Sequence, residues 1–306
     1  MSTLKISATQ HGHNYLPEYY AQASGLFAQR GLTVESWARD PWTGVIEDLD
    51  SGTADLVLGG LWVPAMYAGM GKDLVAVGQV NARCSKVLVT REPVPDFDFT
   101  WIAGRTILAP GAGGTAPYEF TAGLIREAGV DPAAARYVRD LSGAMLGELF
   151  EHGLGDAIIV DTFTATRMIV RGLGHAAFRM ARPGGPMPNS VYYTERHRLA
   201  ELHERLVPFL AAIQEAMDAI TGGAETAALL AEHWPEVPTE ALAQATAELI
   251  DDGTWETVRI DPLACDRWVG ILRDAGLVVT DVDFKQLVDE SALSEAVPVT
   301  GPGGGQ

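Results

Sequence analysis

The first clue to the architecture is the stretch Ser51-Gly52-Thr53-Ala54-Asp55, which follows a helix expected at Trp42–Asp50 and precedes a short buried strand expected at Leu56–Leu58. Gly52 stands where a helix favours a left-handed residue at its end. About a hundred residues later, Glu151-His152-Gly153-Leu154-Gly155-Asp156 lies in the same way between an expected helix and an expected strand, Gly143–Phe150 and Ala157–Val160. The recurring Gly-x-x-Asp indicates a weak internal duplication.

Strand and helix patterns also alternate ahead of each copy. Both halves are expected to contain a strand, a helix and a strand, at Leu4–Ala8, Pro17–Gln29 and Leu32–Trp37, then at Thr106–Leu108, Ala116–Ala128 and Ala135–Val138. This order is typical of parallel βαβ units. Because each half is too small to cover both faces of one large sheet, we predict two α/β lobes rather than a continuous sheet.

Two features divide the chain between these lobes. Prolines interrupt regular structure in Glu92-Pro93-Val94-Pro95-Asp96, which indicates a crossing of the chain. After a strand expected at Asn189–Thr194 the pattern is helical, with helices that we expect to pack back onto the first lobe at Leu199–Ile220, Thr226–Glu232, Thr239–Leu249 and Pro262–Ala275. We therefore predict a discontinuous first lobe of residues 1–92 plus 191–306, a second lobe of residues 93–190, and a disordered tail at residues 298–306.

Composition limits the partners of the chain. Its 306 residues are 47% hydrophobic, which is enough for a sizeable core. A formal charge of -18, from 22 Lys+Arg against 40 Asp+Glu, argues against nucleic acid as a partner. We see no stretch for membrane insertion and no signal peptide, and therefore expect a cytoplasmic protein. Cys84 and Cys265 are too few for a disulfide framework and lack the spacing of a zinc site.

The run Leu16–Glu35, LPEYYAQASGLFAQRGLTVE, resembles the opening of the nitrate, sulfonate and thiamine-precursor solute-binding proteins of ABC importers. Ser51–Asp55 and Ala103-Gly104-Arg105-Thr106-Ile107 are similar to the next two landmarks of that family, and the resemblance covers nearly the whole chain. It implies an α/β, two-lobed, periplasmic-binding-protein type II-like fold with an interlobe cleft that closes around a small molecule.

The same family includes enzymes without export signals, and this sequence departs from them. Hydroxymethylpyrimidine phosphate synthases hold pyridoxal phosphate with a Lys and a His after the third strand, where this chain reads Gly59-Gly60-Leu61-Trp62, and it lacks their cysteine-rich iron motif. Sulfinate desulfinases use a Cys in the loop after the first strand, which here reads Gln10-His11-Gly12-His13-Asn14-Tyr15. Sulfinate desulfinases and chorismate dehydratases are the more distant of the enzymes that the sequence resembles. Neither a named activity nor a cofactor follows from the resemblance.

The loop after the first strand is the densest in hydrogen-bonding groups, and in α/β lobes ligands meet such strand-end loops. Gln10, Asn14 and Tyr15 are candidate ligand-binding residues, and His11 and His13 could act as a general acid or base. The alternative is that one imidazole caps the adjacent helix while the other faces solvent. No Asp or Glu stands at ligand spacing nearby, so we expect no metal.

A glycine-rich loop opens the helix that follows the strand Thr106–Leu108, and its candidate ligand-binding residues are Gly113, Gly114 and Thr115. Exposed backbone N–H groups and the helix dipole favour an anion there. The loop is neither a P-loop nor a dinucleotide-binding motif. The alternative is a tight turn whose glycines only relieve backbone strain.

The remaining candidates each allow a second interpretation. Trp62 could stack on an aromatic ligand or belong to the core. Arg83 could bind a carboxylate or form a surface ion pair, and Cys84 could be a nucleophile or fill core space. Polar groups that could contact ligand oxygens, or serve as cap and turn residues, are Asp161, Thr162 and Asn189.

Two classes of function remain for a protein that binds a small, anionic or aromatic organic molecule in its interlobe cleft. The expected compartment and the two histidines favour a biosynthetic or catabolic enzyme of the lyase, decarboxylase or hydrolase type, in which His11 or His13 moves protons and the glycine-rich loop stabilises negative charge. The alternative is the substrate-binding component of an ABC importer, which partners a permease and performs no catalysis.

Overall fold

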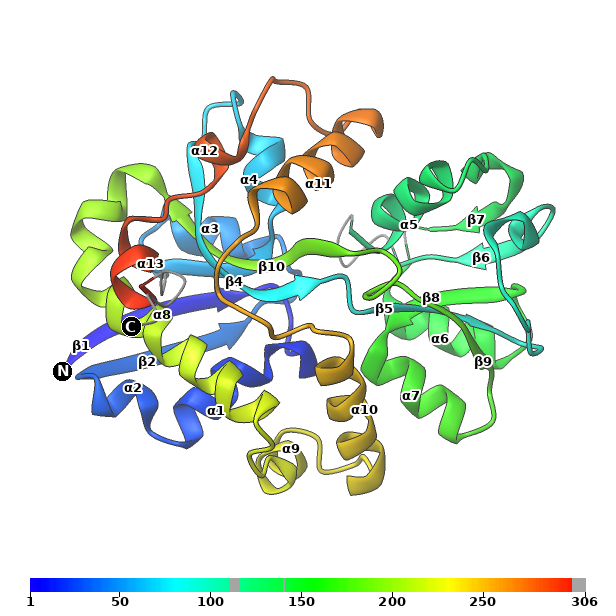
Figure 1. Cartoon of the computed structure of the whole chain (residues 1–306), viewed down its shortest axis with the longest axis horizontal. Coiled ribbons are helices and arrows are strands. Elements are labelled where there is room, and N and C mark those ends of the chain that lie inside the picture. The colour runs from blue at the N-terminus through cyan, green and yellow to red at the C-terminus, as the bar shows by residue number, and fades with distance from the viewer. Residues whose placement is uncertain (111–115, 140, 299–306) are drawn as a thin grey trace, which may run out of the picture.

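The computed structural model describes residues 1–110, 116–139 and 141–298. In this part of the chain two five-stranded sheets lie side by side along the long axis of the molecule (Figure 1). The strand order is β2-β1-β3-β10-β4 in the first sheet and β7-β6-β8-β5-β9 in the second. The predicted two-lobed α/β fold is therefore confirmed.

Both sheets have the same plan. The first contains β1 (Ser2–Ala8), β2 (Leu32–Ala38), β3 (Leu56–Gly60), β4 (Leu74–Arg83) and β10 (Pro186–Glu195), and the second contains β5 (Lys86–Thr90), β6 (Thr106–Leu108), β7 (Arg136–Val138), β8 (Ala157–Asp161) and β9 (His175–Arg179). Strands β2, β1 and β3 run parallel, as do β7, β6 and β8. An antiparallel strand then follows in each sheet, β10 beside β3 and β5 beside β8.

The helices follow the predicted order closely. They are α1 (Leu16–Ala23), α2 (Leu26–Gln29), α3 (Gly44–Asp50), α4 (Trp62–Tyr67), α5 (Ala116–Glu127), α6 (Gly143–Glu151), α7 (Thr162–Val170), α8 (Leu199–Thr221), α9 (Ala227–His233), α10 (Thr239–Asp251), α11 (Pro262–Asp274), α12 (Phe284–Leu287) and α13 (Ser291–Ala296). The single helix expected at Pro17–Gln29 is two helices, because Gly25 adopts a φ of 75° between them. Gly52, with a φ of 70°, confirms the left-handed residue predicted after α3.

The two Gly-x-x-Asp motifs make equivalent contacts. The backbone N–H of Asp55 donates to the Lys5 carbonyl of β1 at 2.8 Å, and the Lys5 N–H donates to the Asp55 carboxylate at 3.0 Å. Asp156 forms the same two bonds with Thr106 of β6, at 2.7 and 2.8 Å. Each aspartate thus ties the start of a central strand to its parallel neighbour, and the internal duplication extends to side-chain detail.

The lobes exchange strands, which the predicted segments did not anticipate. Strand β5 lies within residues 1–92 but pairs in the second sheet, and β10 begins within residues 93–190 but pairs in the first. The stretch Glu92–Asp96 joins β5 to β6 inside the second sheet, so it is not a crossing as expected. The chain crosses instead between β4 and β5 and between β9 and β10. The division into lobes by residue number stays a prediction.

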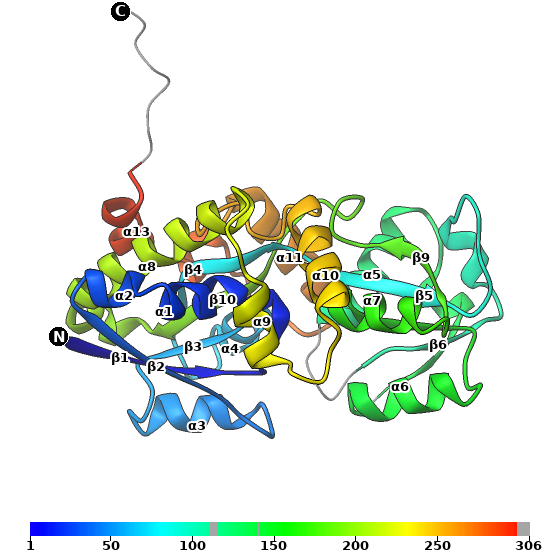
Figure 2. The same ribbon diagram turned by 90° about the horizontal axis from the view of Figure 1, so that it is seen from below.

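The C-terminal helices do not all pack on the first lobe alone. Figure 2 shows α1 and α8 on one face of the first sheet and α3 on the opposite face. Helix α10, however, packs against α7, and α11 packs against α5, so both lie where the lobes meet (Figure 1). These two helices thus contact the second lobe in addition to the first lobe, on which we expected them to pack.

Successive side chains along a strand point into different apolar cores. Leu56 and Leu58 point into a cluster with α1 and α8, whereas Val57 between them points to the side of α3 and α4. In the second sheet Val87 and Val89 face α6 and α7, whereas Leu88 faces the other side. The cluster that contains Val57 and Leu88 also includes residues of α11, so one apolar core runs through both lobes.

Candidate functional site

The loop after β1 holds a network of neutral polar side chains. It continues into a 3₁₀ turn at His13–Tyr15 and then into α1, where Pro17 suits the first turn. Asn14 Nδ2 donates to Asn81 Oδ1 at 2.7 Å, and Asn81 Nδ2 donates to the Asn14 carbonyl at 2.8 Å. Gln10 Nε2 donates to Asn14 Oδ1 at 3.2 Å. The structure thus brings Gln10 and Asn14 together with the end of β4.

Tyr15 extends this network to β10. Its hydroxyl lies 3.4 Å from Thr9 Oγ1 and also forms a hydrogen bond with Ser190, whose neighbour Asn189 is buried. Burial raises the pKa of the Tyr15 phenol above its ordinary value, so the group stays neutral. Uncharged donors and acceptors from the loop after β1 and from strands β4 and β10 therefore meet in what we term the amide–hydroxyl cluster, comprising Asn14, Tyr15, Asn81 and Ser190.

His13 marks the contact between this loop and the second lobe. Its ring lies edge-on to Phe163 of α7, with 5.1 Å between the centroids. Its Nε2 lies 2.9 Å from Thr246 Oγ1, and because that hydroxyl donates to the Leu242 carbonyl at 2.9 Å, we assign the proton of the bond to Nε2. The buried Nδ1 is then an acceptor, without a hydrogen-bond partner among the described residues. Burial lowers the pKa of His13 to about 4, only partly opposed by the charge of Asp161, so the ring is neutral near pH 7.

Asp161 and Thr162 are engaged in the structure of the second lobe. The Asp161 carboxylate caps α7, accepting from the N–H of Thr164 at 2.9 Å and from its hydroxyl at 2.8 Å. The Thr162 N–H donates to the Ser85 carbonyl at 3.1 Å. These contacts are the cap and turn chemistry that the sequence left open as the alternative. A role for either side chain in ligand binding stays a prediction.

The crossing from β4 to β5 contains Arg83 and Cys84. Arg83 Nη2 lies 3.0 Å from a carboxylate oxygen of Glu256, so its guanidinium already has an anionic partner. Cys84 is fully buried, and this burial raises the pKa of its thiol to about 12. A nucleophilic cysteine needs the opposite environment, because only the thiolate attacks. The structure therefore favours packing over catalysis for Cys84.

The other candidates lie apart from the amide–hydroxyl cluster. His11 turns toward α9, with its Nε2 2.9 Å from His233 Nδ1 and its ring stacked on Trp234 at 4.7 Å. Trp62 packs edge-on against Trp42, with 5.2 Å between ring centroids, beside an apolar pocket of about 490 Å³. The candidates of the glycine-rich loop lie outside the described residues: Gly113, Gly114 and Thr115.

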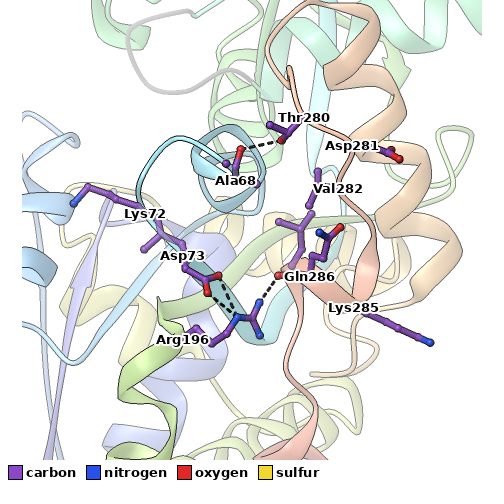
Figure 3. Close-up of a pocket in the computed structure, with 12 residues that line it drawn as sticks. Ala68, Lys72, Asp73, Arg196, Thr280, Asp281, Val282, Lys285 and Gln286 are labelled. Atoms are coloured by element: carbon purple, nitrogen blue, oxygen red, sulfur yellow. Dashed lines mark hydrogen bonds and ion pairs between the residues drawn. The ribbon is translucent and has the colours of Figure 1, made fainter.

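A charged pocket of about 440 Å³ between β4 and α12 is a poor ligand site, because Arg196 in its lining already binds the carboxylate of Asp73 (Figure 3). Arg196 Nε lies 3.1 and 3.0 Å from the two oxygens of Asp73, and its Nη2 donates to the Gln286 carbonyl. Lys285 points away from the pocket in Figure 3. An incoming anion would have to displace the carboxylate of Asp73.

Within residues 1–110, 116–139 and 141–298, no three His, Cys, Asp or Glu side chains are placed to hold a metal ion together. The helices of the same ranges include none that is long and apolar enough to cross a membrane.

Four residues that shape the site were not singled out from the sequence. Asn81 and Ser190 stand in strand-end segments that the sequence did indicate, and a search for amides and hydroxyls there would have found them. Thr246 and His233 lie on helices far along the chain and give no local signal. Only the packing of α9 and α10 brings them to the loop after β1.

Comparison with known proteins gives a consistent family and fold. A family model described as "NMT1/THI5 like" matches residues 12–227. A protein of Bacillus subtilis (strain 168) that bears the name "Putative binding protein YtlA" is 24% identical over 222 residues, which are 71% of this chain and 65% of that protein, so the match spans less than two thirds of that relative.

Two solved structures illustrate the range of proteins with this architecture. The periplasmic aliphatic sulphonate binding protein SsuA from Escherichia coli is similar with a TM-score of 0.75 at 19% identity, covering 94% of this chain and 97% of that one. The desulfurization enzyme DSZB is similar with a TM-score of 0.68 at 15% identity, covering 97% of this chain and 99% of that one. At these identities the likenesses show the fold alone, which binders and enzymes share.

Proposed function

The chain belongs to the NMT1/THI5-like family, as its resemblance to solute-binding proteins predicted, and we propose that it is the solute-binding component of an ABC importer. In this role the two lobes close around one small organic molecule and deliver it to a permease, and no bond of the ligand is broken. The fold of solute-binding proteins and the match to a relative named as a binding protein support this proposal.

The observation that carries the proposal is the chemistry of the amide–hydroxyl cluster. The cluster offers donors and acceptors from the loop after β1 and from strands β4 and β10, and burial keeps the phenol neutral. Such groups recognise a ligand by hydrogen bonds without activating it. The expected catalysts near the cluster are weak, because the Cys84 thiol is protonated and His13 has a pKa of about 4. This combination favours binding over the lyase, decarboxylase or hydrolase activity that the sequence favoured.

We infer that the ligand carries an oxyanion or several oxygens. Side-chain amides such as Asn14 Nδ2 and Asn81 Nδ2 donate to oxygen acceptors. The hydrogen bonds that these two residues now form with each other can be replaced by bonds to ligand oxygens. A sulfonate is the first class to test, because SsuA carries that ligand class in its name. The assignment of an oxygen-rich ligand to this chain is thus itself a proposal.

Calorimetric titration with ethanesulfonate, nitrate and a hydroxymethylpyrimidine tests the proposal, together with mass spectrometry of any molecule that copurifies. We expect one of these classes to bind without chemical change, and Asn81→Ala to weaken that binding about tenfold or more. The exposed amide Gln29 of α2 provides the control variant Gln29→Ala, which should bind as the parent does. Conversion of the ligand to a product, or equal affinities in the parent and Asn81→Ala, would contradict the proposal.

Localisation separates the two classes of function. The expectation of a cytoplasmic protein stays a prediction, whereas the receptor of an importer has to meet its solute outside the cytoplasm. Fractionation of cells that express the complete gene, with detection of the chain by antibody, distinguishes these outcomes. A purely cytoplasmic distribution would count against the importer role.

A further inference from the structure

A third pocket, of about 870 Å³, lies within the first lobe. Its described lining comes from β1 and the loop after it, from α1, α2 and β2, and from α9, with no residue of the second sheet or its helices. It is therefore distinct from the place where His13 meets α7. The volume falls within the range of pockets that hold small organic ligands. Neither the family nor the proposed importer role accounts for it.

The pocket is lined by acidic groups without a basic counterpart. Glu18 of α1 is 3% exposed, and its carboxyl accepts hydrogen bonds from the Tyr192 hydroxyl at 2.9 Å and from Ser36. Glu35 and Glu232 are exposed members of the same lining. Among the described residues that line the pocket, none is Lys or Arg. Burial raises the pKa of the Glu18 carboxyl, only partly opposed by its hydroxyl partners, because no countercharge compensates its desolvation; a bound cation would supply that charge and favour the carboxylate.

An aromatic wall borders the pocket on the side of α9. His11 and His233 are joined at 2.9 Å between ring nitrogens, with their ring centroids 5.1 Å apart and their planes inclined by 21°. Tyr19 stacks on His233 at 4.4 Å. Burial lowers the pKa of both histidines, His11 also being affected by His233, so near pH 7 the wall adds no positive charge to the pocket. Aromatic faces of this kind attract cations.

We propose that this pocket is a second ligand site, which binds a small organic cation with a flat or aromatic body, such as an amine or amidine. The cationic group supplies the countercharge that Glu18 lacks, and the flat body lies along the wall formed by Tyr19, His11 and His233. Gln10 and His11 of the lining belong to the loop that carries Asn14. A ligand in this pocket therefore contacts the same loop that contributes to the amide–hydroxyl cluster.

Three isosteric probes isolate the role of charge: benzamidine, which is cationic near pH 7, benzamide, which is neutral, and benzoate, which is anionic. Titration of the full chain with each probe, followed by calorimetry or ligand-observed NMR, should show benzamidine binding about tenfold or more tightly than benzamide, and no binding of benzoate. Equal affinities for benzamidine and benzamide, tighter binding of benzoate, or absence of benzamidine binding would overturn the proposal.

Variants then place the probe in this pocket rather than between the lobes. Glu18→Gln should abolish the preference for benzamidine over benzamide. Because Glu18 is buried and its substitution can disturb folding, Glu232→Gln serves as a second variant at an exposed position. It should weaken benzamidine binding a few-fold. Glu236→Gln, an exposed acid outside the lining, is the matched control and should leave the affinity unchanged. A loss of benzamidine binding in Glu236→Gln, or no loss in Glu232→Gln, would contradict the location.

Discussion

The two lobes are joined at two seams of different chemistry. At the α11 seam, Trp268 lies edge-on to Phe120 of α5 with 5.8 Å between centroids, and a Cβ on Gly123 would stand only 2.7 Å from Ile271 Cδ1. At the α10 seam the ring of Phe163 packs against His13 and Trp234, and polar contacts stand beside it. Glu248 lies 2.9 Å from the Arg179 guanidinium and accepts from the Thr166 hydroxyl at 2.6 Å.

This difference indicates how the lobes can move. Separation at the α11 seam would expose an apolar core that runs through both lobes, which costs free energy in proportion to its area. Separation at the α10 seam would expose the ring of Phe163 and exchange hydrogen bonds and an ion pair for bonds to water, which costs less than opening the larger apolar core. We therefore expect the lobes to stay joined at α11 and to part at α10, which is the hinge motion that a solute-binding protein requires.

The largest effect should come from the apolar seam. Trp268 is 1% exposed, and Trp268→Ala should lower the free energy of unfolding by about 3–5 kcal/mol, because it leaves a cavity between the lobes. Denaturation by urea, monitored by circular dichroism, measures this loss.

Trp268→Phe is the matched control for the same position. It keeps most of the ring contact and removes an Nε1 that has no hydrogen-bond partner among the described residues, so it should cost less than about 1.5 kcal/mol. If both substitutions cost the same, the loss does not arise from packing at the seam, and the comparison of the two seams fails.

The next effect in size is a pH dependence near the polar seam. His13 lies against Thr246 of α10 and Phe163 of α7, and burial lowers its pKa from 6.5 to about 4. Between these values the unfolded chain binds a proton at this residue and the folded chain does not, so folding stability falls as the pH is lowered from about 6.5 to about 4. The contribution of His13 to that fall should be on the order of 3 kcal/mol.

Urea denaturation at several pH values from 7 to 4 checks this expectation by difference, because other groups also titrate in that range. His13→Gln should show a weaker loss of stability on acidification than the parent chain, whereas the exposed His152→Gln should follow the parent. Parallel pH profiles for the parent and His13→Gln would show that the ring is not held neutral by burial.

The sequence predicted most of the lobes because their signals are local. Alternating strand and helix patterns, Gly52 in the left-handed region and the two Gly-x-x-Asp motifs all depend on neighbours in the chain. The exchange of β5 and β10 between sheets was not predictable in this way. Pairing of β10 with β3 and β4 joins segments more than a hundred residues apart, and no local pattern states which sheet an apolar strand joins.

For the site, too, the sequence indicated the local element and not its distant partners. The loop Gln10–Tyr15 follows a strand and is rich in hydrogen-bonding groups, and the structure places it at the meeting of both lobes. The sequence did not indicate its hydrogen-bond partners, because they are brought close only by the tertiary fold. Asn81 lies 67 residues away from Asn14, and His233 lies 222 residues away from His11. The sequence could not show that Cys84 is fully buried, because burial depends on how distant segments pack together.

A smaller effect is expected from the ion pair of the polar seam. Glu248→Gln removes the charge attraction to Arg179 while an amide oxygen can still accept from Thr166, so the free energy of unfolding should fall by about 1 kcal/mol or less. The lobes should nevertheless open more readily, seen as a larger radius of gyration in small-angle scattering without ligand. The exposed Glu240→Gln on the same helix is the control and should scatter as the parent does.

The smallest effect should come from the same chemical change at the other seam. Glu127 of α5 pairs with Arg267 of α11, with 2.9 Å between Nε and Oε1, and both side chains are partly exposed. Because solvent screens this pair and apolar packing holds the seam, Glu127→Gln should change stability by no more than about 0.5 kcal/mol and leave the radius of gyration unchanged. If Glu127→Gln opened the molecule as much as Glu248→Gln does, charge rather than apolar packing would hold the α11 seam, and the two seams would not differ in the way that the hinge requires.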